Sequence, residues 1–234
     1  MGRHRNLNNR LRVQNALALA KTPNRGVPIS KRTRGTLRLD QGPFIPTEDW
    51  YESTEKNDSA YRIVTQQPGN GYVHALTADE VRERLAELPG WMLKPLEVVQ
   101  LSRMTRKKQT FPCYGMQWGA SLYLYPIEDS LIEFFVHPPK PRVYNESRMY
   151  GGRWESGLFG SCRLIWTRKT LRDYYLDNIL IHELGHLLDD RNNSYVDRER
   201  YAEWFAIEYG YKARRRRMAE QAARRTVRRR HHST

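Results

Sequence analysis

The chain has 234 residues, of which 39% are hydrophobic and 28% are charged, and its formal net charge is +14. This length and apolar content suffice for one sizeable core, whereas no apolar run is long enough to span a membrane. Cys113 and Cys162 are too few for a disulfide framework, and the N-terminal residues lack the apolar block of a secretory signal. We therefore expect an intracellular protein in a reducing compartment, without a membrane span.

The positive charge is concentrated at the two ends of the chain. Residues 1–40 contain ten Lys or Arg and one acidic residue, and residues 212–234 again contain ten and one. Each end therefore carries a net charge of +9, while the segment 41–211 carries −4. Basic ends of this kind are typical of polyanion binding or of solvated arms. The sequence thus predicts DNA or RNA as a partner of both tails, within the cell or in a nucleoprotein particle.

Composition divides the chain into three parts. We expect a basic extended arm over residues 1–45, a folded domain over 46–211 and an arginine-rich tail over 212–234. The arm has one helical pattern, at 8–21, before Pro, Gly and basic residues take over. Because the tail has no base-reading motif, we expect binding that tolerates many sequences and weakens steeply with salt. The candidate contacts are Arg214, Arg215, Arg216, Arg217, Arg224, Arg225, Arg228, Arg229 and Arg230.

The first elements expected in the folded domain are a helix and four strands. Thr77 and Glu80 form a capping-box pattern, and the apolar residues that follow at helical spacing predict a helix ending before Pro89. We expect the second and third strands to form a hairpin, and the segment between the last two to be a long functional loop. Alternating and β-branched runs place the strands at 96–101, 121–125, 131–137 and 162–167.

Two helices follow the last strand and complete an α+β domain. The first is predicted at about 171–190 with Thr170 as its N-terminal cap, and the second begins after the capping pattern Ser194–Asp197. The short turn between them makes the two helices antiparallel. The second helix has no strong stop signal and continues past Gly210 into the basic tail.

The first of these helices contains the sequence His182-Glu183-Leu184-Gly185-His186. Residues at i and i+4 lie one above the other on a helix, so both imidazoles can reach one metal ion. Glu183 is then placed to contact a water molecule on that ion rather than the ion itself. This pattern is typical of zinc peptidases, in which the metal activates water and a glutamate accepts its proton.

A catalytic zinc ion usually has three protein ligands, so a third is expected from elsewhere in the chain. Asp189 and Asn192 occupy the positions where a metzincin motif would require Gly and His. An antiparallel second helix instead brings Glu199 and Glu203 level with the two histidines. Either glutamate can bind the metal while the other holds a ligand imidazole, whereas Glu208 is expected on a solvated face.

The segment HELGHLLDD, followed by ERYAEWFA, resembles the gluzincin metallopeptidases, and among them the group of the anthrax lethal factor catalytic domain. The match covers about residues 176–209. The resemblance implies a small zincin-like domain, with a short mixed β-sheet followed by an active-site helix and an antiparallel glutamate helix. It makes Zn²⁺ the cofactor, His182, His186 and Glu199 its ligands, Glu183 the general base and Glu203 the partner of a ligand histidine.

Together these features predict a zinc-dependent endopeptidase that acts on a protein or peptide and is tethered to nucleic acid by its tails. The oxyanion of such a reaction requires a further hydrogen-bond donor, for which Tyr195, Tyr201 and Tyr209 are candidates. The strand at 163–167 is either the sheet edge that pairs with an extended substrate or an ordinary core strand. The alternative function is a catalytically idle zincin-fold protein with a structural role in a nucleic-acid-containing assembly.

Overall fold

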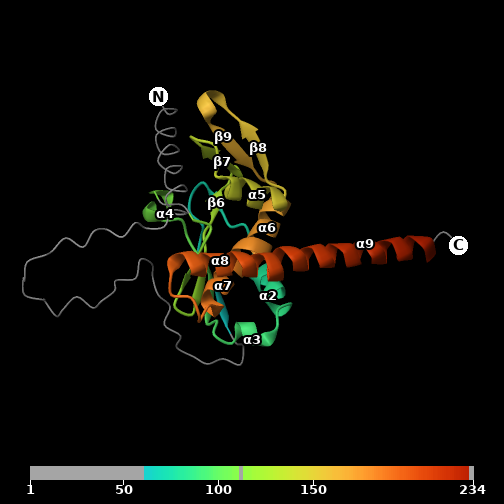
Figure 1. Cartoon of the computed structure of the whole chain (residues 1–234). Helices are drawn as coiled ribbons and strands as arrows, with labels where there is room; N and C mark the ends of the chain where they lie inside the picture. Colours follow the sequence, from blue (N-terminus) through green and yellow to red (C-terminus); the bar gives the residue numbers. More distant parts are fainter. Residues whose placement is uncertain (1–60, 111–112, 232–234) are drawn as a thin grey trace, which may run out of the picture.

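A four-stranded mixed sheet lies against the buried helices of the folded body (Figure 1). The computed structural model describes residues 61–110 and 113–231, so the predicted arm over 1–45 lies outside the described residues. The sheet has the order β1-β3-β5-β4, in which the first three strands are parallel and β4 is antiparallel to β5. Its strands are β1 (Arg62–Thr65), β3 (Val98–Leu101), β4 (Gly115–Trp118) and β5 (Ser121–Leu124).

The central strands of this sheet are buried along their whole length. Every residue of β3 and β5 is buried, as expected of parallel strands that carry few charged residues. β4 and β5 form a hairpin around Gly119, whose φ of 55° lies in the left-handed region that favours glycine. A separate two-stranded ribbon pairs β2 (Tyr72–Val73) with β6 (Ile127–Glu128).

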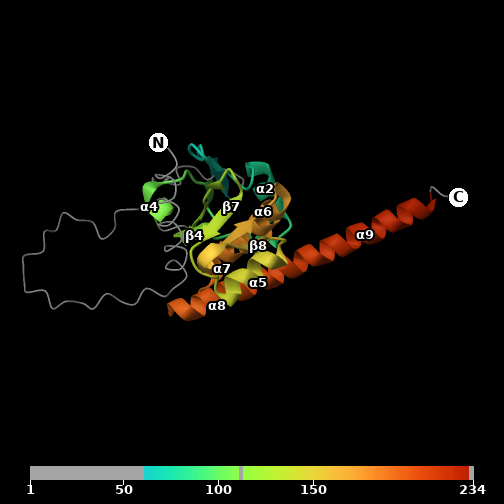
Figure 2. The same ribbon diagram turned by 90° about the horizontal axis from the view of Figure 1, so that it is seen from above.

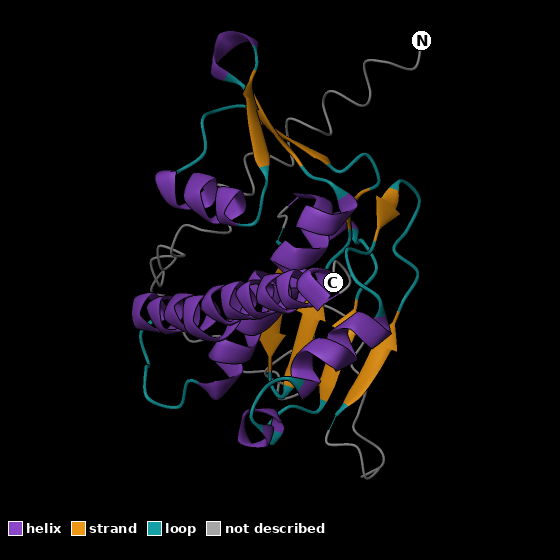
Figure 3. Ribbon diagram, turned by 90° about the vertical axis from the view of Figure 1, so that its right-hand side faces the viewer, coloured by secondary structure: helices purple, strands orange, loops and turns teal. Residues whose placement is uncertain are grey.

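Short helices connect the strands of the larger sheet. The predicted capping box is confirmed, because Thr77 and Glu80 exchange their hydrogen bonds at the start of α2 (Ala78–Ala86). Val81 and Leu85 of this helix are buried in the core. Figure 3 looks along the C-terminal helix and shows α2 in front of the strands. The remaining connecting helices are α3 (Gly90–Leu93) and α4 (Arg106–Thr110).

A second sheet stands above the first and has the order β7-β9-β8, with antiparallel pairing throughout (Figure 1). The predicted strands at 131–137 and 162–167 are confirmed as β7 (Ile132–Phe135) and β9 (Cys162–Ile165). The predicted hairpin between 121–125 and 131–137 is wrong. β5 pairs with β3 and β4, whereas β7 pairs with β9, because the intervening β6 is taken up by the ribbon with β2.

The predicted long loop at 138–161 is also wrong, because this segment contains a helix and a strand. α5 (Pro141–Met149) begins with a proline in its first turn, where proline is well tolerated. β8 (Arg153–Ser156) follows, and the ring centroid of its Trp154 lies 4.8 Å from that of Phe135 on β7. A short helical turn, η1 (Leu158–Gly160), joins β8 to β9 at the exposed end of this sheet.

The predicted active-site helix is continuous but begins earlier than expected. It comprises α6 (Arg168–Tyr174), the π-helical segment η2 (Tyr175–Ile179) and α7 (Leu180–Leu188). The prediction that Thr170 is the cap is wrong. Thr167 caps the helix, and Thr170 provides the reciprocal hydrogen bond of a capping box three residues later.

The second predicted helix runs from α8 (Tyr195–Phe205) through π-helical η3 (Ala206–Lys212) into α9 (Ala213–His231). Ser194 caps it as predicted, since its side chain accepts a hydrogen bond from the backbone of Asp197. α9 leaves the body as a single projecting helix (Figures 1 and 2). Among the described residues, no helix is long and apolar enough to cross a membrane.

The first turns of α9 are held to the body by acidic residues of α6 and η2, in the other long helix. Asp177 accepts from Arg84 Nε at 2.7 Å and from Arg217 Nη2 at 2.8 Å. Asp173 accepts from Arg214 Nη2 at 2.8 Å. Two of the arginines predicted to contact nucleic acid are therefore engaged with the folded body.

Candidate metal centre

Both histidines of the HELGH segment lie on α7 and face the same side of it. The Nε2 atoms of His182 and His186 are 3.1 Å apart, and the ring centroids are separated by 4.8 Å. This proximity follows from the i, i+4 spacing on a regular helix. The two nitrogens are close enough to share one metal ion.

Glu199 on α8 completes the cluster, as the sequence predicts. Its Oε1 lies 3.3 Å from His186 Nε2, and its Oε2 lies 3.8 Å from His182 Nε2. The three ligand atoms all fall within 4.8 Å of one another, which makes this set a possible metal-binding triad. Two imidazoles and one carboxylate are a donor set that suits zinc.

The close approach of α8 to α7 depends on Gly185, between the two histidines. A Cβ atom at this position would lie 3.0 Å from the Cα of Ala202 and 3.0 Å from the Cβ of Phe205. Arg198 further links the helices, because its Nη2 donates to the backbone carbonyl of His186 at 3.2 Å. The small residue lets the glutamate helix pack near enough for Glu199 to reach the histidines.

The electrostatic environment keeps Glu199 anionic. Burial raises the pKa of its carboxyl, but the hydrogen bond from His186 and the charges of His182 and Arg142 outweigh burial and lower the pKa to about 2. A carboxylate that is charged at neutral pH beside two imidazoles is ready to bind a cation without first losing a proton.

Glu183 lies next to this cluster but is buried against the edge of the sheet. Its side chain is 8% exposed, and its carboxylate accepts a hydrogen bond from the backbone N–H of Gln117 on β4. Burial raises the pKa of Glu183 to about 7, against the opposing charge of His186. A Cβ atom on Gly115 would lie 2.8 Å from Glu183 Oε1, so this glycine provides the room for the carboxyl.

A cleft of about 560 Å³ opens over the cluster between β4, α5 and the two long helices. It is lined by the His182, His186 and Glu199 cluster, by Glu183, by residues 113–118, and by further side chains that include Tyr150 and Tyr174. Of the three tyrosines predicted as oxyanion donors, Tyr195 is the one that lines the described part of the cleft. Burial and the Glu199 carboxylate, to which its phenol donates a hydrogen bond, raise the pKa of Tyr195.

The other two candidate tyrosines are packed elsewhere. Tyr201 lies with its ring centroid 5.5 Å from that of Trp204, and Tyr209 lies 4.5 Å from Phe205 by the same measure. Both pack against the core rather than line the cleft. Their residue type and helical location resemble those of Tyr195, so the sequence had no signal to separate the three.

Glu203 lines the cleft beside the triad and forms an ion pair with Arg142 of α5. Arg142 also donates from Nε to Glu146 Oε1 at 2.7 Å. The Arg142–Glu203 ion pair therefore connects α5 to α8 across the cleft. The role of Glu203 as the partner of a ligand imidazole stays a prediction.

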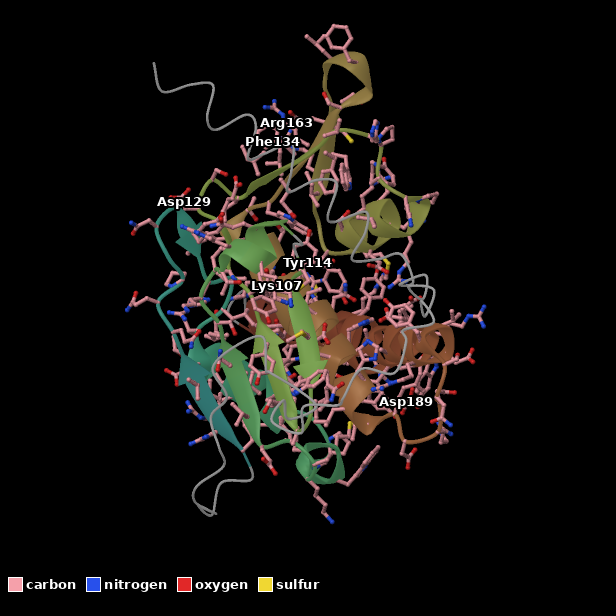
Figure 4. The ribbon with its side chains drawn as sticks, turned by 90° about the vertical axis from the view of Figure 1, so that its left-hand side faces the viewer. Lys107, Tyr114, Asp129, Phe134, Arg163 and Asp189 are labelled. Carbon is pink, nitrogen blue, oxygen red and sulfur yellow. The ribbon has the colours of Figure 1, made fainter. Side chains whose placement is uncertain are left out.

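The strand at 163–167 is not a sheet edge. β9 lies between β7 and β8, and Figure 4 places Arg163 on the upper sheet, remote from Asp189 at the end of α7. The strand that borders the cleft is β4, the last strand of the larger sheet, which sequence reasoning missed. Its signal was the Gly119 turn between two short apolar segments.

Sequence reasoning also missed α5, which brings Arg142 and Glu146 to the cleft. The available signal was Pro141, a residue that is frequent in the first turn of a helix. Because a loop was expected over residues 138–161, Arg142 and Glu146 were not predicted to line the cleft.

The tail arginines divide into two groups. Arg214 and Arg217 are partly buried in ion pairs with the body, whereas Arg215, Arg216 and Arg224 are exposed on α9. The side chains of Arg225, Arg228, Arg229 and Arg230 lie outside the described part of the chain.

Comparisons with known proteins add no further constraint, because no family model, no curated protein and no solved structure matches this chain. A functional conclusion therefore depends on the geometry and chemistry of the cleft.

Proposed function

We propose that this protein is a zinc-dependent endopeptidase of the gluzincin type. The observation that carries the proposal is the juxtaposition of the His182, His186 and Glu199 cluster with the buried Glu183 carboxyl in one cleft. The donor set fits zinc, and the three residues would hold it. A zinc ion bound there supplies Lewis-acid activation of water and of the scissile carbonyl.

Glu183 is the general base in this proposal. A carboxyl with a pKa of about 7 accepts a proton from the attacking water and returns it to the leaving amine near neutral pH. The hydrogen bond from the backbone N–H of Gln117 fixes the orientation of the carboxylate. Tyr195 is the donor best placed to stabilise the developing oxyanion, because its phenol lies at the cleft and contacts Glu199.

The substrate in this proposal is an extended peptide that lies along β4. This strand is at the edge of its sheet and borders the cleft, so its main chain can add a peptide as a further strand. Main-chain pairing tolerates varied side chains, which suits a protein substrate. The aromatic side chains of Tyr114, Tyr150 and Tyr174, which line the cleft, would receive an apolar side chain of the substrate.

The decisive experiment compares Glu183→Gln with the matched control Glu208→Gln, which removes a carboxylate that is ion-paired to Lys212 on η3. Hydrolysis of a fluorogenic peptide library and zinc content are measured on both variants. We expect Glu183→Gln to lose about 10²–10⁴-fold in rate and to retain zinc, because general base catalysis contributes about this factor. Full activity of Glu183→Gln would refute the mechanism. Wild-type protein that binds zinc but hydrolyses no peptide would favour the structural alternative.

We further propose that α9 tethers the protein to DNA or RNA. Arg215, Arg216 and Arg224 are exposed on a helix that projects from the body and holds a single acidic residue, Glu220. Binding of duplex DNA and of RNA, measured against salt concentration, should weaken steeply, since each neutralised phosphate releases counterions. Replacing these three arginines by Ala should lower the slope by about 3. An unchanged slope would exclude these three arginines as phosphate contacts.

A further inference from the structure

A buried lysine lies beside a cysteine on the wall of the cleft. Lys108 of α4 is 8% exposed, and its Nζ lies 3.1 Å from the Sγ of Cys113. The same Nζ lies 3.9 Å from Met116 Sδ and 4.0 Å from the ring centroid of Tyr125. Figure 4 marks the neighbouring residues Lys107 and Tyr114 in the middle of this face.

The nearest contacts of the Lys108 ammonium group are not carboxylates. In the described part of the chain, its contacts are a thiol, a thioether and an aromatic face, and none is a carboxylate oxygen within ion-pair distance. A buried ammonium group is unfavourable unless an anion compensates its charge. Of its three contacts, only the thiol of Cys113 can become an anion near neutral pH.

Cys113 is also accessible. It is partly exposed, lines the cleft and carries a thiol rather than a disulfide. A cysteine that is both accessible and close to a cation is the kind that reacts, because the thiolate is the nucleophile. Cys162 is also partly exposed, but its sulfur has different surroundings. Its thiol lies 3.5 Å from the carbonyl oxygen of His137, and burial raises its pKa.

We propose that Cys113, held as a thiolate by Lys108, is a covalent modification site that takes soft electrophiles of the hydroperoxide class. The thiolate sulfur attacks one peroxide oxygen, so an S–O bond forms while the O–O bond breaks. The sulfur is oxidised by two electrons to the sulfenic acid and the peroxide is reduced. The leaving group, hydroxide from hydrogen peroxide or alkoxide from an organic hydroperoxide, takes a proton from solvent and departs as water or an alcohol.

Other charged and titratable groups face this pair from the neighbouring elements. Glu183 of α7 interacts electrostatically with Lys108, and Tyr175 of η2 interacts with Cys113. Burial raises the pKa values of Tyr114 and Tyr175 well above their usual range, so both phenols stay neutral in the experiment. Glu183 is thus a second acidic group near the ammonium, and a thiolate must form in its presence.

The test measures alkylation of the full-length chain by iodoacetamide between pH 5.5 and 9, with each cysteine followed by peptide mass spectrometry. Cys162 is the internal reference. We expect Cys113 to react at least about tenfold faster than Cys162 at pH 6.5, because a stabilised thiolate is populated there and an ordinary thiol is not. After brief exposure to hydrogen peroxide, dimedone should label Cys113 and leave Cys162 unlabelled.

Two variants identify the cause. Lys108→Met should lower the alkylation rate of Cys113 at pH 6.5 about tenfold and leave that of Cys162 unchanged, whereas Lys108→Arg should keep the fast rate. Equal rates for the two cysteines in the wild-type chain would overturn the proposal even if Lys108→Met failed to fold. A fast rate that survives in folded Lys108→Met would overturn it as well. Labelling is read by mass, so the result does not depend on peptide hydrolysis.

Discussion

Gly210 lies where the two long helices cross, and its replacement by Ala tests whether that crossing supports the fold. A Cβ atom at position 210 would lie 1.8 Å from the backbone oxygen of Asp177 on η2. Real Cβ atoms essentially never approach closer than 3.0 Å, so η2 and η3 would have to separate by about 1.2 Å. The obstacle is backbone and cannot rotate away.

The cost of Gly210→Ala follows from this geometry. Overpacking costs about 1–3 kcal/mol, and a backbone obstacle puts this case near about 3 kcal/mol, or roughly 6–12 °C in Tm for a domain of this size. The shift also disturbs the bond from Arg84 Nη2 to the carbonyl of Tyr209, which measures 2.6 Å. Thermal unfolding followed by circular dichroism measures the effect. Gly90→Ala is the matched control, because nothing lies within 4 Å of its added Cβ. A Tm for Gly210→Ala equal to that of the control would refute the reasoning.

Three further changes probe the anchoring of α9 and the metal site. Asp177→Asn should cost about 3–5 kcal/mol, because it removes the carboxylate paired with buried Arg84 and leaves that guanidinium only the longer, 3.4 Å pair with half-exposed Glu87 among the described residues, and an unchanged urea midpoint would contradict this. Burial raises the pKa of Asp173, but Lys169 and Arg214 outweigh it and lower that pKa. Its stabilising contribution is therefore present above the ordinary carboxyl pKa and is lost as pH falls through the lower folded value. Asp173→Asn should flatten the loss of stability below about pH 4, and an identical acid profile would argue against the pairing. Glu199→Ala should weaken zinc binding by more than about 100-fold, since outer-shell partners alone contribute about 10–100-fold, and wild-type affinity in a competition titration would exclude it as a ligand.

The metal cluster was predictable because its members are related by local helical geometry. His182 and His186 are one helical turn apart, and Glu199 follows after a short turn that makes the next helix antiparallel. The relative positions of these side chains depend on the rise per residue of a helix and on the helix caps. Both are determined by residues that are close in the sequence. The predicted cap at Ser194 and the triad were recovered for this reason.

Strand partners were not predictable in the same way. The runs at 121–125 and 131–137 are strands as predicted, yet they belong to different sheets. The residue pattern of a strand shows which of its faces is apolar. It does not show which strand pairs with it, because pairing is a contact between segments that are distant in the sequence. The same limit led to 163–167 being considered as the substrate edge in place of β4.

The sequence alone determined how charge is distributed between the basic ends of the chain and its acidic middle segment. The net charges of +9 at each end and −4 between, and the metal-binding residue types at helical spacing, follow from composition and local order. Only the tertiary structure showed that Arg214 and Arg217 are drawn into ion pairs with Asp173 and Asp177. It also brought β4 to Glu183. These contacts depend on how helices and sheets pack across long separations in the chain, and packing is a property of the whole fold.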